Sequence, residues 1–439
     1  MKKIFLGLLI ITLFSIGTLF ARPVNLEIAT QVANMKITIK GKTDYIVDDV
    51  FELKDEDGKI LSYVFNLNPK GYIAISTDTD ITPVIAYSFR NNFVAEDIPQ
   101  NIGYQMLKRD MQLRLEAIPL TSDEIKSKNN LSWLNYEKGN VSFFQTKGRE
   151  IWPSPGTTPT GGWVETQWNQ NPSPYWDFCP YKPTGTYTGR CVVGCVATAM
   201  AQIINYHRYV GDVTFSDADD YTSAGNVNNQ DYFYCQIDNQ YNTYDFPSFP
   251  ELNGYLESVK NCYLTNDDLS NTDIAALSFA CGVSVEMNYH PEGSGAYASD
   301  VPIAFLNKFN YDSATNYSSS YPGFYSLIAD NMMNAQPGAL SISGAGNHYI
   351  VCDGYDSSGD NLFHLNFGWG GSSDGWYSLP NGMPSGFNVV NKATMNIEGG
   401  ELPFLEIDSY FVAELTGDFD GNVNPGESIA LRIRLSNRE

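Results

Sequence analysis

The residues of this chain best suited to chemistry are one cysteine and one histidine, each placed where a regular element begins. Cys195 lies where a turn ending at Gly194 leads into a predicted helix, and His348 opens an apolar predicted strand much later in the chain. A thiol at a helix N-terminus lies at the positive end of the helix dipole, which favours the thiolate. This pairing is what a thiol nucleophile and its general base require. The alternative is a buried or disulfide-bonded Cys195 and an unrelated His348.

Two elements must position these side chains. The helix is predicted over residues 196–206, where an apolar stripe marks its buried face, and His207 is expected to cap its end. Gly194 has no Cβ, so a substrate carbonyl could approach the backbone there. In the strand, His348 and Cys352 share one face because side chains alternate with a period of two. His348 is therefore expected at the cleft end of a face that otherwise packs inward.

Four segments of the chain carry a recognisable set of residues in a fixed order. They are 167–170 followed by Cys179-Pro180, 194–202 followed by Tyr206-His207, 348–355, and 366–375. These segments resemble the streptopain family of secreted papain-clan cysteine peptidases, and the resemblance extends from about residue 25 to 398. It implies an α+β fold of the papain-like, two-lobed type. A helical lobe would surround Cys195, an antiparallel β lobe would surround His348, and the cleft would lie between them.

The resemblance also implies a role for each catalytic residue. Cys195 would attack the scissile carbonyl as the thiolate, and His348 would deliver its proton to the leaving amine. The oxyanion hole would take its donors from the backbone N–H of Cys195 and the side-chain amide of Gln170. Gln167 is the alternative glutamine for this role.

A late strand and the turn after it supply the residues expected to support the imidazole. Asn366 is predicted to accept from the imidazole N–H, and Trp369 to shield that bond from water. The family usually has tryptophan where this chain has Phe367, which puts an imidazole-supporting role for that position in doubt. His364 could replace His348 as the base, but its place inside an apolar strand favours a structural role.

The loop 289–296 resembles the family loop that lines the non-primed side of the cleft. We expect Ser294 and Gly295 to bond the backbone of an extended peptide; an ordinary surface turn is the alternative. Asn347 stands where the family tends to have glycine. Its side chain is expected to narrow the approach to the S1 subsite and to alter substrate preference.

The chain is predicted to begin with three successive parts. Residues 1–21 read as a signal peptide, because Lys2 and Lys3 precede an apolar run; an uncleaved anchor is the alternative. Residues 22–147 contain short alternating strands, predicted at 44–47, 61–66 and 71–76, and one helical segment at 104–117. They resemble the family's inhibitory propeptide, and an ordinary β-rich domain is the alternative. Residues 148–398 are predicted to form the peptidase domain.

Two further segments carry predictions of their own. The segment 147–162 is rich in Pro, Gly and Thr, so it is expected to lack regular structure and to be cut near Lys147. Residues 401–439 resemble the first strands of an immunoglobulin-like β-sandwich. Within them, residues 418–424 alternate oxygen donors like a calcium loop, but Glu427 falls two positions short of the usual ligand. A polar turn is therefore favoured there.

Composition argues against several kinds of partner. The chain has 439 residues and a formal net charge of −23, so it offers no basic stripe to nucleic acid. No histidine or cysteine spacing is typical of a metal site, and we expect neither a metal nor another cofactor. Seven cysteines leave at least one thiol free, with Cys195 the obvious candidate. A bridge between Cys179 and Cys191 is expected, and buried free thiols are the alternative.

The sequence therefore predicts a secreted cysteine endopeptidase made as a zymogen. Its partners would be protein or peptide substrates and its own propeptide as an intramolecular inhibitor. It would be extracellular, or held at the cell surface by the C-terminal module, without stable membrane association after signal cleavage. Two alternatives are a thiol amidase or transglutaminase acting on cell-wall peptide, and a catalytically dead homologue that only binds. The presence together of Cys195, His348, Asn366 and Trp369 argues against the dead homologue.

Overall fold

The computed structural model describes residues 22–144, 150–227, 229–344, 346–358, 361–384, 386–399, 404–416 and 428–438. Three predictions lie outside the described residues: the signal peptide, the cleavage point at Lys147 and the turn at 418–424. The residues from 22 to 144 are called the N-terminal part below, and those from 150 to 399 the main part.

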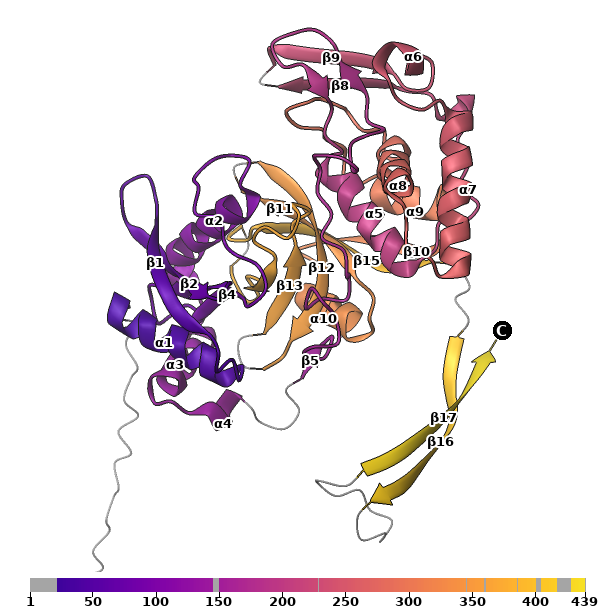
Figure 1. Cartoon of the computed structure of the whole chain (residues 1–439). Helices are drawn as coiled ribbons and strands as arrows, with labels where there is room; N and C mark the ends of the chain where they lie inside the picture. Colours follow the sequence, from indigo (N-terminus) through magenta and orange to yellow (C-terminus); the bar gives the residue numbers. More distant parts are fainter. Residues whose placement is uncertain are drawn as a thin grey trace, which may run out of the picture.

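Helices and strands are both frequent in the described chain (Figure 1). The α-helices are α1 (Leu26–Ile39), α2 (Ile102–Ala117), α3 (Asp123–Glu137), α4 (Val141–Phe144), α5 (Cys195–His207), α6 (Tyr241–Tyr244), α7 (Phe249–Thr265), α8 (Asn271–Ser284), α9 (Val301–Asn307) and α10 (Phe324–Met333). The strands of the large sheet are β1 (Ile46–Lys54), β2 (Ile60–Asn68), β3 (Tyr72–Ser76), β4 (Val84–Ser88), β5 (Ile151–Trp152), β10 (Tyr311–Ser318), β11 (Gly338–Ser343), β12 (Asn347–Asp356), β13 (Leu362–Asn366), β14 (Gly375–Ser378) and β15 (Val390–Gly399). Three separate pairs are β6 (Tyr181–Lys182) with β7 (Gly189–Arg190), β8 (Thr222–Val227) with β9 (Asp231–Gln236), and β16 (Phe404–Thr416) with β17 (Ser428–Arg438).

One antiparallel sheet joins the N-terminal part to the main part. Its strand order is β1-β2-β3-β4-β14-β13-β12-β11-β15-β10, and β5 pairs with β12. The junction is the pairing of β4 with β14, where Tyr87 lies opposite Trp376 and Ala86 opposite Tyr377. The main part contributes its helices mostly before its strands: α5, α7, α8 and α9 precede β10. The molecule is therefore of the α+β class, with antiparallel sheets.

Local sequence explains where the helices begin. The side chain of Asn25 accepts a hydrogen bond from the N–H of Ile28 at the start of α1. Ser270 and Asp273 form a capping box at the start of α8, which satisfies two backbone N–H groups that have no partner inside the helix. α5 differs, because its N-cap is Gly194 and no side chain caps it. The first N–H groups of α5 therefore have no capping side chain.

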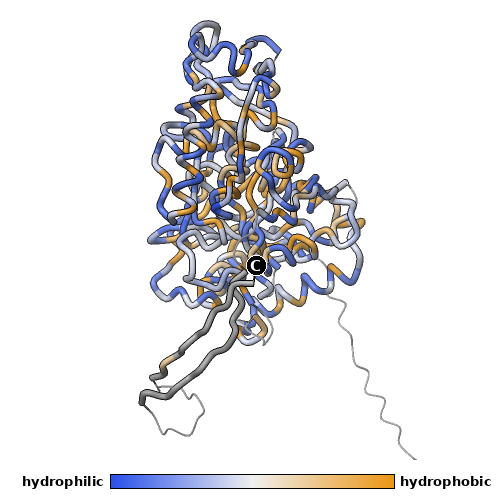
Figure 2. The backbone as a smooth tube through the Cα atoms, turned by 90° about the vertical axis from the view of Figure 1, so that its right-hand side faces the viewer, coloured by the Kyte–Doolittle hydropathy of each residue, from blue (hydrophilic) through white to orange (hydrophobic). Residues whose placement is uncertain are grey.

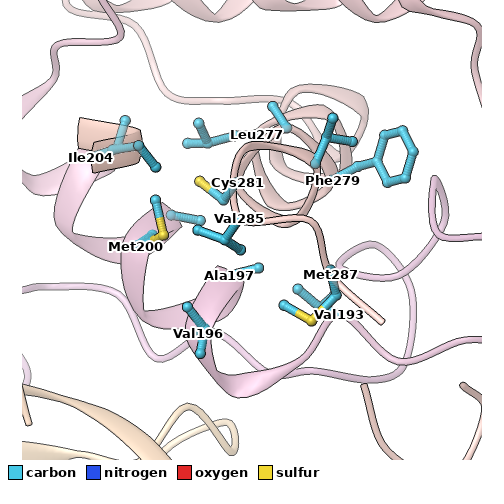
Figure 3. Packing of buried hydrophobic residues seen from close by; sticks show 14 of the residues in the cluster. Val193, Val196, Ala197, Met200, Ile204, Leu277, Phe279, Cys281, Val285 and Met287 are labelled. Carbon is cyan, nitrogen blue, oxygen red and sulfur yellow. The ribbon is translucent and has the colours of Figure 1, made fainter. Parts of the chain in front are cut away.

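Apolar side chains are buried in three clusters. One fills the helical half of the main part, and Figure 3 shows α5 and α8 packing face to face in it. The other two lie on opposite faces of the N-terminal strands, so that Tyr72 and Ala74 of β3 belong to one cluster and Ile73 and Ile75 to the other. The outermost loops at the top of Figure 2 are largely hydrophilic. β3 is covered on both faces, which is why all of its residues are buried.

Several elements match the sequence-based expectations. The helix predicted from residues 104 to 117 is α2, and the nucleophile helix is α5, which ends one residue beyond the predicted span. Strands occur at each of the predicted N-terminal positions, and two antiparallel strands occur in the C-terminal segment. The described part of that segment contributes only the pair β16 and β17.

Two expectations are corrected. The boundary segment was expected to lack regular structure, yet Ile151 and Trp152 form β5 and pair with Asp356 and Tyr355 of β12. The backbone hydrogen bonds offered by the edge of β12 outweigh the local preference of residues 147–162 for irregular structure. The second correction concerns the cysteines, all seven of which are free. The expected bridge between Cys179 and Cys191 is therefore absent, and these buried thiols pack as apolar side chains.

Candidate active site

Cys195 is the first residue of α5, and glycine is needed directly before it. Gly194 has a φ of 90°, in the left-handed region that favours glycine. A Cβ at this position would lie 2.8 Å from the Sδ of Met287 and 3.1 Å from the carbonyl oxygen of Ser294. The turn that presents Cys195 therefore accommodates only glycine.

The thiol of Cys195 lies within the electrostatic reach of the His348 imidazole, because α5 packs against β12 and His348 is the second residue of that strand. His348 is buried, with 7% of its surface exposed, and Cys195 is half-buried. Burial raises the pKa of the Cys195 thiol, but the charge of His348, the hydrogen bond to it and the N–H groups of Tyr349 and Val196 lower that pKa by more. The net pKa lies below the usual thiol value, which favours the thiolate.

The imidazole of His348 is held by a backbone carbonyl and an indole ring. Its Nε2 lies 3.3 Å from the carbonyl oxygen of Phe367. A carbonyl only accepts hydrogen bonds, so Nε2 carries a proton and Nδ1 is left for the thiol. The ring of Trp369 lies parallel to the imidazole, with centroids 6.3 Å apart and 15° between the planes. Trp369 therefore lies next to the imidazole and parallel to it.

Asn366 does not take the role that was predicted for it. Its Nδ2 donates to the carbonyl of Thr166 at 2.8 Å, and its Oδ1 accepts from the N–H of Gly368 at 3.0 Å. Its amide also contacts Gln202 of α5. The alternation of the strand predicts the face on which Asn366 lies. The side-chain amide, however, bonds the backbone groups of Thr166 and Gly368 and not the imidazole. The carbonyl of Phe367 orients the imidazole instead, through an atom that does not depend on the side chain at that position.

Asp374 holds the backbone that carries this carbonyl, and the sequence analysis assigned it no role. Its Oδ1 accepts from the N–H of Phe367 at 2.8 Å. Burial raises the pKa of Asp374 to about 7, against the lowering effect of the Phe367 N–H and of His364. The available signal was its place in the Ser373-Asp374-Gly375 segment, which was part of the family resemblance.

The two candidate glutamines are in different environments. Gln170 is buried. Its backbone carbonyl accepts from the N–H of Val193, two residues before Cys195, at 3.0 Å. Its Nε2 is buried and has no hydrogen-bond partner among the described residues. The Nε2 of Gln167 lies 3.2 Å from the Oδ1 of Asn91 and 3.3 Å from the Oδ2 of Asp374. Only Gln170 has its side-chain N–H groups free for another acceptor.

The predicted substrate-binding residues do not come together as a set of free groups. The hydroxyl of Ser294 donates to the carbonyl of Val192 at 2.6 Å. Gly295 exchanges both of its backbone hydrogen bonds with Asn288. These groups are therefore already used inside the protein, which removes the basis for the predicted contacts with a peptide backbone. Asn347 is exposed and lies directly before His348; its effect on the approach to S1 stays a prediction.

The other histidines have structural surroundings. The Nδ1 of His364 lies 2.6 Å from Asp353, and both side chains are buried. This matches the structural role expected for His364. His207 ends α5, but burial lowers its pKa to about 4, so it is neutral at physiological pH. The expected stabilisation of the helix dipole by a charged His207 is therefore wrong, because burial outweighs the effect of the dipole.

The N-terminal part contacts the turn that carries Asp374. The N–H of Ser373 donates to the carbonyl of Asn92 at 3.2 Å, and the Nδ2 of Asn91 donates to the carbonyl of Asp374 at 3.3 Å. A Cβ on Gly103 of α2 would lie 2.4 Å from the Cβ of Ser373, so the helix can approach this closely only because residue 103 is glycine. The imidazole support and the N-terminal part therefore share one turn.

Polar contacts extend this interface along the shared sheet. The hydroxyl of Tyr72 donates to the carbonyl of Ser373 at 2.9 Å and lies 2.7 Å from the hydroxyl of Tyr377. The Nζ of Lys40 lies 2.6 Å from the carboxylate of Asp356, which is 1% exposed. Burial raises the pKa of Asp356, but the charges of Lys40 and Lys36 and the hydrogen bonds from Lys40 and Ser358 together lower it by more, so the net pKa lies below the usual carboxyl value. A buried ion pair thus fastens the N-terminal part to β12.

Comparison with known proteins gives two family matches. Residues 168–377 match the Peptidase C10 family, and residues 21–114 match the Spi protease inhibitor family. The chain is 26% identical to streptopain of Streptococcus pyogenes serotype M28 (strain MGAS6180) over 362 residues, which are 76% of this chain and 80% of that protein. It is 25% identical to the thiol protease/hemagglutinin PrtT of Porphyromonas gingivalis over 431 residues, 91% of this chain and 43% of PrtT.

A solved structure is also similar to this chain. It is a fragment of prointerpain A of Prevotella intermedia, with a TM-score of 0.48 and 23% sequence identity, covering 81% of this chain and 99% of that one. The two family matches lie side by side in the chain, inhibitor before peptidase, and streptopain matches across both. Together these matches support a cysteine peptidase of the streptopain, or C10, type with an inhibitory propeptide.

Proposed function

We propose that this chain is a secreted endopeptidase zymogen that cleaves peptide bonds with Cys195 and His348. The observation that carries the proposal is the thiol of Cys195 at the start of α5, whose pKa is lowered chiefly by the charge of His348 on the facing strand. The match to the Peptidase C10 family supplies the reaction class, a cysteine-type peptidase acting on protein.

The chemistry follows from the contacts around the thiol. The Cys195 thiolate attacks the carbonyl carbon, and the carbonyl oxygen becomes an oxyanion that accepts from the Cys195 backbone N–H and the Nε2 of Gln170. The His348 imidazolium then gives its proton to the amine that leaves. Water, deprotonated by the neutral imidazole, attacks the acyl-enzyme, and the carboxylate product departs as the thiolate is restored.

A two-lobed, papain-like peptidase is the architecture that we propose for the main part. Cys195 comes from the helical half, with α5, α7, α8 and α9, and His348 comes from the strand half, β10 to β15. We propose residues 148–398 as this domain and 22–147 as the inhibitory propeptide. The contacts of residues 22–147 with the turn that carries Asp374 support a role for the propeptide in covering the active site. Residues 1–21 are proposed as the signal, and residues 401–439 as the start of a β-sandwich-like module.

We propose that the protein acts outside the cell, or at the cell surface through its C-terminal module. Within the described residues, no helix combines the length and the apolar character needed to cross a membrane.

Hydrolysis of casein by the processed enzyme tests the proposed reaction. Wild type is expected to release acid-soluble peptides, and Cys195→Ala and the iodoacetamide-treated enzyme are expected to release none. Ammonia is measured in the same samples, with a primary amine present as acceptor. Ammonia release or amine incorporation without cleavage of the casein backbone would replace the endopeptidase with an amidase or a transglutaminase.

A further inference from the structure

A cavity of about 290 Å³ lies between the N-terminal part and the main part. Residues 40–42 and 87–90 form one wall, and the boundary segment, β13 and β14 form the other. The basic or imidazole side chains that line it are Lys40, Lys42, Arg90 and His364. No carboxylate is among its described lining residues. The chain as a whole has 50 acidic and 27 basic residues, so this lining reverses the general charge balance.

Two of these cationic groups face the same gap. Gly161 has a φ of 97°, and a Cβ there would lie 3.5 Å from the Nε of Arg90 and 3.9 Å from the Nε2 of His364. The Nδ1 of His364 is held by Asp353 at 2.6 Å, which turns Nε2 toward the cavity. Arg90 donates from Nη1 to the carbonyl of Pro159, and its Nε has no partner among the described residues. The Nε of Arg90 and the Nε2 of His364 therefore both lie beside the same face of Gly161, at the wall of the cavity.

The positive charge of the cavity is only partly compensated. Burial lowers the pKa of His364, but the charge and hydrogen bond of Asp353 and the charge of Asp374 together raise it by more, so the net pKa lies above the usual value for imidazole. Lys40 is neutralised by Asp356. Lys42 lies 5.8 Å from the centre of the Phe89 ring and has no ion pair among the described residues. Lys42 and Arg90 form no ion pair with a carboxylate among the described residues. A negative group in the cavity could therefore interact with both of these cations.

Apart from the hydroxyl-bearing Tyr87, Ser88 and Thr160, the rest of the lining is apolar or glycine. Phe89 and Trp376 belong to the two facing walls, and Pro153 and Pro155 come from the boundary segment. The volume is at the lower end of the range for small-molecule sites. The cavity therefore suits a small molecule with one anionic end and one apolar end.

We propose that this cavity binds a small carboxylate with an apolar body. The carboxylate lies between Arg90 and His364, with Lys42 beside it, and the body contacts Phe89 and Trp376. The bidentate geometry of a guanidinium suits a carboxylate acceptor.

Binding here couples to the release of the propeptide, a consequence that rests on the proposed function. Lys42 and Arg90 belong to the N-terminal part, and His364 belongs to the main part. A ligand that contacts both stabilises their association by mass action. Its presence is expected to slow conversion of the full chain, and separation of the two parts is expected to release the ligand.

The test uses the full chain with Cys195→Ala, which removes the nucleophile, and phenylacetate as the probe. Calorimetric titration is expected to show saturable binding, and phenylacetate is expected to raise the melting temperature. Phenylacetamide has the same shape without the charge and is expected to bind about tenfold more weakly or less. Inorganic phosphate serves as the anion without an apolar body and is also expected to bind more weakly.

Substitutions of lining residues locate the site. Lys42→Gln and Arg90→Gln are each expected to weaken phenylacetate binding about tenfold. Lys70→Gln, at an exposed turn outside the cavity lining, is expected to change nothing. Melting temperatures without ligand show whether each variant is folded. Lys42 is half-buried on a loop, so Lys42→Gln is expected to fold.

Several results would overturn the proposal. They are the absence of saturable phenylacetate binding, equal binding of the amide, tighter binding of phosphate, or no effect of either cavity variant. Conversion of the wild-type chain with and without phenylacetate is followed separately. A chain that never self-processes refutes the proposed function while leaving the binding result intact.

Discussion

His348 affects Cys195 through both charge and a hydrogen bond, and its removal has a predictable effect on the thiol. His348→Asn keeps a polar side chain but removes the positive charge. The pKa of Cys195 is then expected to rise, because burial remains and the largest lowering contribution is lost. The thiolate in wild type persists to lower pH, so the rate profile of alkylation by iodoacetamide should move toward alkaline pH in the variant. The rate is measured on the Cys195 peptide by mass spectrometry across a pH series.

Cys262 provides an internal control for this measurement. It is the other half-buried cysteine, and burial, followed by the charge of Asp273, raises its pKa. Its alkylation profile should be the same in both proteins. Superimposable Cys195 profiles in wild type and His348→Asn would show that the imidazole does not control the thiol.

Gln170 and Gln167 offer a matched pair for the oxyanion hole. Gln170→Ala in the processed enzyme is expected to lower kcat by about 10²- to 10³-fold with little change in KM, because the lost donor acts in the transition state. Gln167→Ala is expected to have a much smaller effect, since its amide bonds Asn91 and Asp374. Steady-state kinetics on a peptide substrate give both constants. Equal losses of kcat in the two variants would contradict the assignment.

At the scale of residues, sequence and structure agree where the side chain itself does the chemistry. Cys195 and His348 were predicted from a helix start and a strand start, and the structure places them in contact. The support of the imidazole could not be predicted, because the carbonyl of Phe367 belongs to the backbone and leaves no trace in residue type. The lowered pKa of His207 could not be predicted, because burial depends on the packing of distant segments.

At the scale of elements, the turn between β13 and β14 acts as a support for the imidazole. Asp374→Asn is expected to lower kcat by up to about 10²-fold, because a small displacement of the Phe367 carbonyl misplaces the imidazole. KM should change much less, and the lowered pKa of Cys195 should move toward its usual value. Kinetics and the alkylation profile together separate this positioning role from a general loss of folding. An unchanged alkylation profile would contradict it.

The same carboxyl gives a prediction for pH. Burial raises the pKa of Asp374 to about 7, above its usual value of 3.8. The folded protein therefore binds this proton more tightly than the unfolded chain does. The resulting stabilisation is fully present below the usual carboxyl pKa and is lost as pH rises through about 7. In the Cys195→Ala full chain, melting temperature should fall over this range, and adding Asp374→Asn should reduce the slope. Parallel curves of melting temperature against pH in the two proteins would contradict the raised pKa of Asp374.

Local patterns explain most of the helices and strands but not their partners. The helix α2 and the strands β1 to β4 follow from spacing and turn residues within each segment. The pairing of β4 with β14 joins residues almost 300 positions apart, and no local pattern encodes it. β5 was missed for the same reason, since a strand of two residues forms only because the edge of β12 is available.

At the scale of the whole molecule, one buried ion pair holds the propeptide to the peptidase. Lys40→Gln leaves the Asp356 carboxylate buried without its main partner, at a cost of about 3–5 kcal/mol. Conversion of the full chain is therefore expected to be faster in this variant, as followed by gel densitometry. Because the pKa of Asp356 is lowered, the stabilisation of the proform by this pair is fully present above the usual carboxyl pKa. This stabilisation is lost as pH falls through the lowered pKa of Asp356. Lys70→Gln is the control; equal rates in Lys40→Gln and wild type would contradict the role.

The order of the parts could be predicted from the sequence, because the propeptide and peptidase segments each resemble known ones and match them in order. Their common sheet could not, since it depends on which strand edges remain open after each part has folded. The free state of all seven cysteines could not be predicted either, because spacing says nothing about the distance between thiols.

The most direct test of the account is the intact mass of the purified full chain over time, beside Cys195→Ala and with or without iodoacetamide. Wild type is expected to lose the proposed propeptide, with a cut near Lys147. Cys195→Ala and the alkylated protein are expected to stay whole. If wild type also stays whole while Cys195 resists alkylation, or if Cys195→Ala is cut at the wild-type rate, Cys195 is not the nucleophile of a self-processing peptidase.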